Sequence, residues 1–159
     1  MIEPIISDMK RLVKLHRSLL YVSKEKTEAL KSNDTPKLRQ LDLEEKKHIQ
    51  AIQKVEKGRQ EHVNDWYARQ GTEDQQTISD MLTHLEGEEH EQLNEEYEAM
   101  ILVLADLKHQ ERLNGELTKQ SLQFINLSLD LLKPELANLN YGSEEKPAHS
   151  NRSIFDSKA

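Results

Sequence analysis

Apolar residues recur along the chain at the period of an α-helix, and they are densest over residues 113–132. No charged residue occurs over residues 120–129, although 32% of the chain is charged. At about 100° per residue, this segment carries two adjacent apolar faces. One face comprises Leu122, Ile125, Leu129 and Leu132, and the other comprises Leu113, Leu117, Phe124 and Leu131. A helix packed on one neighbour needs a single stripe, so the second face requires a further surface to cover it.

Two long amphipathic helices are expected before this segment. The first covers residues 5–33 and the second covers residues 36–69. Between them, the sequence SNDTP gathers turn and capping residues, with Thr35 as the expected N-cap and Pro36 as the first helical residue. Gly58 lies inside the second helix, where glycine costs roughly 1 kcal/mol relative to alanine.

A loop and a short helix are expected next. The loop covers residues 71–76, in which Thr72 and Gln75 have the spacing of a capping box. The short helix is expected to end near Gly87, and its apolar residues are Ile78, Met81, Leu82 and Leu85.

The last helix is expected to cover residues 88–133, a length of about 70 Å, and to end at Pro134. Continued by heptads, its first apolar stripe reaches three polar residues, which are Glu111, Asn114 and Thr118. The apolar face therefore shifts sideways around Gly115 before it broadens.

These patterns predict an all-α protein, an elongated antiparallel helical bundle of three long helices plus one short helix. The predicted bundle domain covers residues 1–136. Residues 137–159 are polar and rich in turn residues, so we expect a flexible, disordered C-terminal tail.

Composition narrows the range of functions. Hydrophobic residues make up 35% of the chain and aromatic residues 4%, enough to fill narrow seams between helices but not a thick core. The net charge of -7 argues against a nucleic-acid partner, which requires clustered Lys and Arg. No apolar run is long enough for membrane insertion. The chain has no cysteine, and its first residues, MIEPIISDMKRL, lack the pattern of a signal peptide. We therefore expect a cytoplasmic protein.

Two spacings could bind metal. Glu45 and His48 have the Glu-x-x-His spacing of a di-iron or di-manganese bundle, and Asp106 and His109 have the analogous one. Such a site also needs carboxylates from other helices, and a chain with 29 acidic residues produces these spacings by chance. Surface or seam positions are the favoured interpretation, and we expect no metal or other cofactor.

Other chemical motifs are weaker. His84, Glu88, Glu89 and His90 surround Gly87 but lack the continuous His-Glu-x-x-His spacing of zinc hydrolases. The sequence has no glycine-rich phosphate loop and no nucleophile elbow, so we expect no enzyme activity. Glu56 and Arg59 are three residues apart on the apolar side of their helix. They can form a solvated pair or contact another helix, and both interpretations stay open.

Three stretches carry a family resemblance. They are LLYVSKEKTEAL (19–30), EEKKHIQAIQKVEKGR (44–59) and LKHQERLNGELTKQSLQFINLSLDLL (107–132). In their order and separation, with a polar tail after them, they resemble the FlgN family of flagellar type III export chaperones. The resemblance covers roughly residues 5–135.

The resemblance implies a small cytoplasmic helical chaperone that is not an enzyme. It implies binding to the C-terminal helical regions of hook-associated proteins, which form the hook–filament junction. Such a chaperone prevents premature assembly of these proteins and delivers them to the flagellar export gate. The expected cargo-binding residues form what we term the C-terminal patch: Leu113, Leu117, Leu122, Phe124, Ile125, Leu129 and Leu132.

Tyr141 is the candidate for docking on the export gate, because related chaperones use a tyrosine near the C-terminus. A tail tyrosine without a role is the alternative.

Two other classes stay open. A homodimeric coiled-coil adaptor or structural protein would cover the C-terminal patch with a second copy, and a tight dimer that no cargo disrupts would favour it. A metal-binding bundle enzyme would contain stoichiometric iron or manganese.

Overall fold

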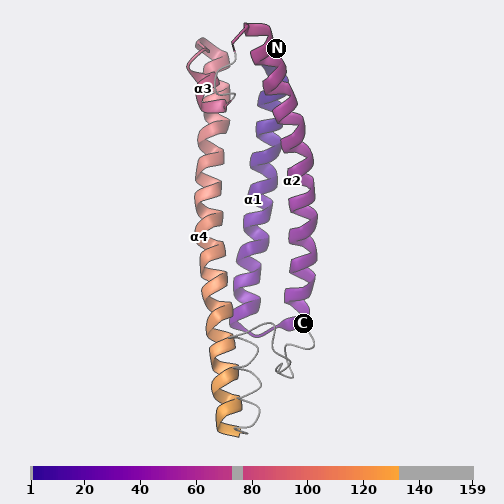
Figure 1. Cartoon of the computed structure of the whole chain (residues 1–159), viewed down its shortest axis with the longest axis vertical. Helices are drawn as coiled ribbons and strands as arrows, with labels where there is room; N and C mark the ends of the chain where they lie inside the picture. The colour runs from indigo at the N-terminus through magenta and orange to yellow at the C-terminus, as the bar shows by residue number, and fades with distance from the viewer. Residues whose placement is uncertain (1, 73–76, 133–159) are drawn as a thin grey trace, which may run out of the picture. The chain divides into compact units, whose positions relative to one another are not determined.

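The computed structural model describes residues 2–72 and 77–132 of the 159-residue chain, and within these ranges the regular structure is helical (Figure 1). Beyond Gln120, the side chains described are those of Leu122, Gln123, Asn126, Leu127 and Leu131. The helices are α1 (Glu3–Lys31), α2 (Thr35–Gln70), α3 (Ile78–Leu82) and α4 (Gly87–Leu132). The predicted all-α fold, with three long helices and one short helix, is confirmed.

The chain divides into two units, Met1–Asn114 and Gly115–Ala159. The division falls inside α4, at the glycine around which the sequence predicts a shift of the apolar face. Each unit is described by itself. The domain boundary predicted between residues 136 and 137, the tail over 137–159 and Tyr141 lie outside the described residues and stay predictions.

The turn between α1 and α2 differs by one residue from the expectation. Asp34, not Thr35, is the N-cap of α2, and its Oδ1 accepts a hydrogen bond from the backbone N–H of Lys37 at 3.1 Å. Asn33 adopts a positive φ of 54°, a conformation that asparagine tolerates better than most residues. The predicted N-cap was wrong because both residues are good caps and the turn places the Asp34 carboxylate over the helix end.

The segment between α2 and α4 holds two further caps. Gly71, with φ 70°, ends α2 in the left-handed conformation typical of a helix C-terminus. The Thr77 hydroxyl accepts a hydrogen bond from the backbone N–H of Asp80 at 3.1 Å and begins α3. The predicted capping box depends on Gln75, which lies outside the described residues. The short helix ends at Leu82, earlier than expected, and Gly87 with φ 62° begins α4.

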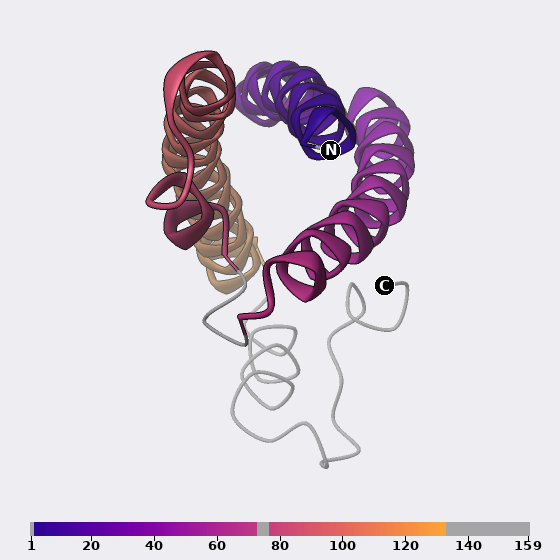
Figure 2. The same cartoon turned by 90° about the horizontal axis from the view of Figure 1, so that it is seen from above.

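In the first unit, α1 lies between α2 and α4 (Figures 1 and 2). Residues from all four helices form a core where α1 begins, α2 ends and α4 begins. Its buried members are Ile2, Ile5, Ile6, Met9, Leu12, Val55, Val63, Trp66, Tyr67, Ile78, Met81 and Leu93. Each large apolar side chain fully buried contributes roughly 1.5–3 kcal/mol, so this cluster is the main apolar contribution to stability.

Tyr67 attaches the short helix α3 to this core. Its ring is fully buried and packs edge-on against Trp66, with ring centroids 4.9 Å apart. Its hydroxyl lies 2.8 Å from Asp80 Oδ2 and 3.2 Å from the Thr77 carbonyl oxygen. The buried hydroxyl is thus satisfied by the residues that begin α3, as a buried polar group requires.

Away from the main core, ion pairs add to the apolar packing between α1 and α2. Val22, Ala29 and Leu41 form a second, smaller cluster there. Beside it, Lys26 Nζ lies 3.0 Å from Glu45 Oε2 and 3.1 Å from Asp42 Oδ1. Burial lowers the pKa of Lys26, but its hydrogen bonds with Glu45 and Asp42 outweigh that effect, so the pKa is raised. The charge is therefore retained in the seam.

Polar residues replace apolar ones along the α1–α4 seam. The α1–α4 polar cluster consists of Ser23, Thr27, Gln110, Glu111 and Asn114, and three of these side chains (Ser23, Thr27 and Asn114) are buried. Glu111 and Asn114 are two of the three polar residues at which the sequence predicts the stripe to break. Their partners on α1 explain how the break is accommodated.

Hydrogen bonds connect this cluster continuously. Asn114 Nδ2 donates to the Ser23 carbonyl oxygen at 3.0 Å, and its Oδ1 accepts from the Thr27 hydroxyl at 2.5 Å. The Thr27 oxygen accepts from Gln110 Nε2, and the Ser23 hydroxyl donates to Glu111 Oε1 at 2.7 Å. Since Ser23, Thr27 and Asn114 are buried, the bonds among them are needed to offset their desolvation.

Replacing Asn114 with Ala should leave buried groups of Ser23 and Thr27 without partners. We expect the free energy of unfolding to fall by about 1–3 kcal/mol. Urea denaturation followed by the fluorescence of Trp66, the single tryptophan, measures this loss. A Ser23→Ala/Thr27→Val/Asn114→Leu variant removes donors and acceptors together and should cost less than Asn114→Ala alone. A triple variant that costs more would contradict this account.

Candidate functional site

The C-terminal patch is only partly within the described side chains. Leu113 and Leu117 are half-buried, and Leu122 is 56% exposed. The side chains of Phe124, Ile125, Leu129 and Leu132 lie outside the described residues, so their predicted role is untested. The cargo-binding role of the C-terminal patch therefore stays a prediction. Further exposed leucines are described on the same helix.

Two exposed leucines of the same helix were not among the expected cargo-binding residues. Leu127 is 56% exposed and Leu131 is 78% exposed. They are four residues apart and share one side of the helix, whereas Leu122 lies about 140° around the axis from Leu127. The spacing of Leu127 and Leu131 could have identified this pair. Helix α4 thus exposes apolar side chains on more than one side.

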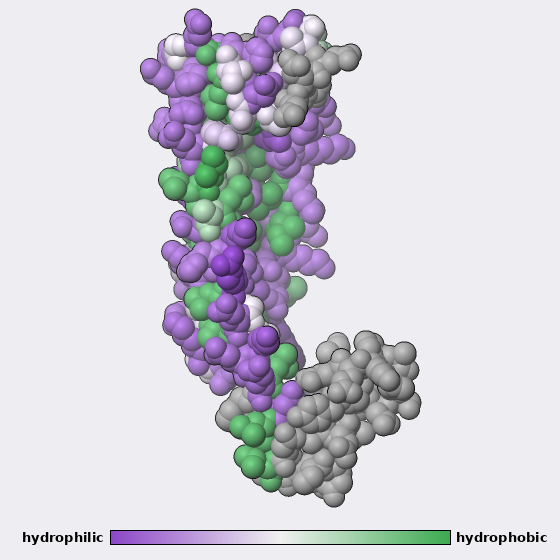
Figure 3. Space-filling view, turned by 60° about the vertical axis from the view of Figure 1, so that its left-hand side comes forward, coloured by the Kyte–Doolittle hydropathy of each residue, from purple (hydrophilic) through white to green (hydrophobic). Residues whose placement is uncertain are grey.

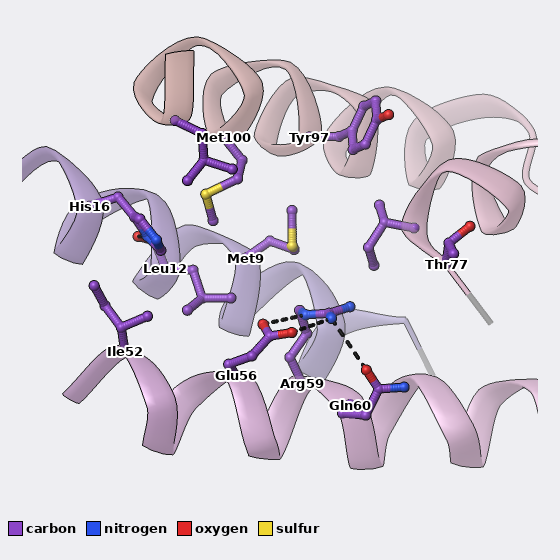
Figure 4. A pocket seen from close by; sticks show the side chains of 12 residues that line it. Met9, Leu12, His16, Ile52, Glu56, Arg59, Gln60, Thr77, Tyr97 and Met100 are labelled. Carbon is purple, nitrogen blue, oxygen red and sulfur yellow. Dashed lines mark hydrogen bonds and ion pairs between the residues drawn. The ribbon is translucent and has the colours of Figure 1, made fainter. Parts of the chain in front are cut away.

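A second apolar surface lies wholly in the first unit, where α2 and α4 face each other across α1 (Figure 4). It is a cavity of about 460 Å³, which we term the α2–α4 groove. Its lining residues are Met9, Leu12, His16, Ile52, Glu56, Arg59, Gln60, Thr77, Ile78, Tyr97, Met100 and Leu104. None of them was expected as a site residue, because one sequence does not show which helices lie side by side.

Glu56 and Arg59 form a two-pronged ion pair in this groove. Arg59 Nε donates to Glu56 Oε2 at 2.7 Å, and Arg59 Nη2 donates to Glu56 Oε1 at 2.5 Å and to Gln60 Oε1 at 3.4 Å. The hydrogen bonds with Glu56 raise the pKa of Arg59, so its charge is fixed. The pairing of Glu56 with Arg59 that the sequence allowed is observed, but with Arg59 only 14% exposed it lies in a groove and is not the solvated pair of the first interpretation.

The floor of the groove also carries a polarised imidazole. His16 Nδ1 lies 2.7 Å from the carbonyl oxygen of Leu12. A carbonyl oxygen only accepts, so Nδ1 carries the proton, and in the neutral ring Nε2 is an acceptor. The groove therefore offers one fixed cation and one imidazole acceptor within apolar walls.

Exposed apolar residues occur on α2 and α4 close in sequence to the residues that line the groove. Ile49 on α2 is partly exposed, and so are Ile101 and Leu104 on α4. Figure 3 shows one face of the molecule on which apolar surface gathers between polar regions. A single exposed leucine is ordinary, but a cavity lined largely by apolar residues is typical of a binding surface.

The residues considered as metal ligands either bond to other protein groups or are exposed. His48 Nδ1 donates to the Glu44 carbonyl oxygen, and its Nε2 accepts from the Ser18 hydroxyl, both at 2.7 Å. Glu45 pairs with Lys26, whereas Asp106 and His109 are exposed. Among the described residues, no group of three or more His, Asp or Glu side chains could hold a metal ion. None of the described helices combines the length and apolar character needed to cross a bilayer.

The exposed leucines should contribute little to folding. We expect a Leu122→Gln/Leu127→Gln/Leu131→Gln variant to change the urea unfolding transition of Trp66 by less than about 0.5 kcal/mol, since the substituted side chains are solvated. By comparison, Met81→Ala removes a fully buried side chain and should cost about 2–5 kcal/mol. Equal losses in the two variants would show that the leucines are part of the folded core.

A protein-family model and a known protein each match nearly the whole chain. The family model described as FlgN protein matches residues 1–149. A protein of Bacillus subtilis (strain 168), described as "Uncharacterized protein YvyG", is 40% identical over 158 residues, which cover 98% of this chain and 97% of that protein. No solved structure matches the chain. Because the family model and this relative each cover nearly the whole chain, the resemblance found in the sequence is confirmed, and the chain belongs to the FlgN family of flagellar chaperones.

Proposed function

We propose that this protein is a cytoplasmic flagellar export chaperone for hook-associated proteins. It binds their C-terminal helical regions, prevents premature assembly and delivers them to the export gate. The observation that carries this proposal is the exposure of Leu122, Leu127 and Leu131 on different sides of α4, in a chain of the FlgN family.

Burial of these leucines supplies the driving force for cargo binding. Each leucine buried fully against a partner contributes roughly 1.5–3 kcal/mol, less the cost of ordering the partner's helix. An amphipathic helix laid along α4 suits the side that carries Leu127 and Leu131, because its apolar residues recur at matching spacings. Leu122 lies on another side of α4 and requires a second contact with the cargo. The chaperone and its cargo thereby cover surfaces that would otherwise promote aggregation.

Delivery to the gate requires a separate contact. Tyr141 is the candidate, on the basis of the family resemblance alone, since it lies outside the described residues. The proposal assigns no chemical step to the protein. Holding and release follow from the balance between buried apolar surface and the entropy of the bound helix.

Acidic substitutions in the C-terminal patch should abolish cargo binding. We expect the purified protein to bind the C-terminal segment of a hook-associated protein from the same organism with a negative heat-capacity change. Phe124→Asp/Leu129→Asp places a charge on each predicted face and should weaken binding by at least 100-fold. Isothermal titration calorimetry measures the affinity, and circular dichroism should show helicity close to that of the unmodified protein.

A matched variant separates apolar contact from charge. Lys119→Gln/Gln123→Asp also lowers the net charge by two but changes exposed polar residues of the same helix. This variant should bind cargo within about threefold of the unmodified protein. Equal affinity in both double variants would move the cargo surface elsewhere. Failure of the folded, unmodified protein to bind the segment, together with a stable dimer in sedimentation, would favour the adaptor instead.

A further inference from the structure

The α2–α4 groove has the length of two helical turns. Its lining residues run from Met9 to His16 on α1 and from Tyr97 to Leu104 on α4. Seven residues at 1.5 Å each correspond to about 10 Å, just under two turns of helix. An occupant of this length presents side chains at positions i, i+3 or i+4, and i+7, the anchors by which an amphipathic helix fills a groove.

The walls suit apolar anchors of variable shape. Met9, Met100 and Leu12 face the cavity (Figure 4), and Leu104 also lines it. Thioether side chains adapt to different partners. A cavity of about 460 Å³ lies within the usual range for binding sites. Helical bundles commonly have four helices, and a helix between α2 and α4 would take the fourth position.

Arg59 determines which kind of polar group a helix bound in the groove must supply. Its side chain is only 14% exposed and points from α2 toward the cavity (Figure 4). Nε and Nη2 bond to Glu56 and Gln60, but within residues 2–72 and 77–114 no hydrogen bond reaches the two N–H groups of Nη1. At present water can satisfy these donors. A helix that covers the groove removes that water and must therefore supply an acceptor.

A carboxylate is the acceptor that best meets this requirement. Hydrogen bonds between a guanidinium and a carboxylate are charge-assisted and stronger than those to an amide. Glu56 is 47% exposed and bonds to Nε and Nη2 of Arg59, and Asp8 also acts on the charge of Arg59 without forming an ion pair with it among the described contacts. Neither acid bonds to Nη1, so this group can receive an acid of the occupant. A purely apolar helix would leave a fixed cation with unpaired donors beneath it.

We infer that the α2–α4 groove is a second docking site, which receives two turns of an amphipathic cargo helix with an acidic side chain facing Arg59. This inference rests on the proposed function, because the helix is taken to come from the same hook-associated protein. It assigns that protein a contact in the first unit, separate from the C-terminal patch.

The test compares two leucines of the same helix. Leu104 lines the groove and is 47% exposed, whereas Leu102 is 67% exposed and lines a different depression with Arg17 and Leu20. Leu104→Glu and Leu102→Glu make the same chemical change on α4. In titrations of the full-length protein with the hook-associated C-terminal segment, Leu104→Glu should weaken binding at least tenfold, and Leu102→Glu less than twofold.

A second pair of measurements tests the acid. Glu56→Gln/Arg59→Met leaves the net charge unchanged and removes the guanidinium from the groove, and it should weaken binding of the segment about tenfold. Replacing the segment's acidic residues one at a time by their amides should identify one whose loss is not additive with this variant. Additive losses at every acidic position would overturn the pairing with Arg59. Urea unfolding followed by Trp66 verifies that each variant is folded.

The outcomes separate the two proposals. If the segment binds, fails to bind Phe124→Asp/Leu129→Asp, and binds Leu104→Glu and Leu102→Glu alike, the chaperone function stands and the groove proposal is overturned. If the segment does not bind the unmodified protein, both are overturned. If the unmodified protein forms a dimer that Leu104→Glu dissociates, a second copy occupies the groove and the cargo-docking proposal is overturned.

Discussion

The desolvation of polar groups in the α1–α4 seam is the constraint on which the first unit depends. Asn114 bonds to both Ser23 and Thr27, and sliding α4 along α1 by one turn would leave all three buried and unpaired. Apolar seams tolerate small shifts because one leucine replaces another, whereas a hydrogen-bonded seam has one register. That register fixes the axial position of α4 along α1. It thereby fixes where Tyr97 and Leu104 lie in the lining of the α2–α4 groove.

The small number of apolar residues explains where surfaces remain open. Hydrophobic residues make up only 35% of the chain, and the core of the first unit is concentrated around Tyr67 and Trp66 at one end, where residues from all four helices meet. Farther along, the α1–α2 seam relies partly on Lys26 with its two acids, and the α1–α4 seam on the polar cluster. The α2–α4 groove borders the core and shares Met9, Leu12 and Ile78 with it, and among the described residues no further long helix lines it. The groove proposed as a docking site thus lies where the chain's own packing is incomplete.

The sequence predicts what is local and misses what depends on neighbours. The helical period of the apolar residues predicted the bounds of all four helices to within a few residues. The three-residue spacing of Glu56 and Arg59 likewise indicated that they could pair. The polar break at Glu111 and Asn114 was visible, but its partners on α1 were not, because they are more than eighty residues away in sequence. The N-cap at Asp34 was missed since adjacent capping residues compete within one turn. The groove was missed because its walls come from helices whose relative placement no periodicity reports.

If one cargo chain occupies both proposed docking surfaces, the two contacts together determine how it is held and released. The leucines of the second unit and the groove of the first are joined through a single continuous helix, α4. When a cargo chain engages one surface, the other binds at an effective concentration set by the connecting segment, and the combined affinity can exceed either alone by 10²–10⁴-fold. Each contact can then be weak enough to dissociate separately. The proposed function, retention of cargo followed by delivery, would benefit from such two-site docking, because release would then proceed through two small barriers instead of one large one.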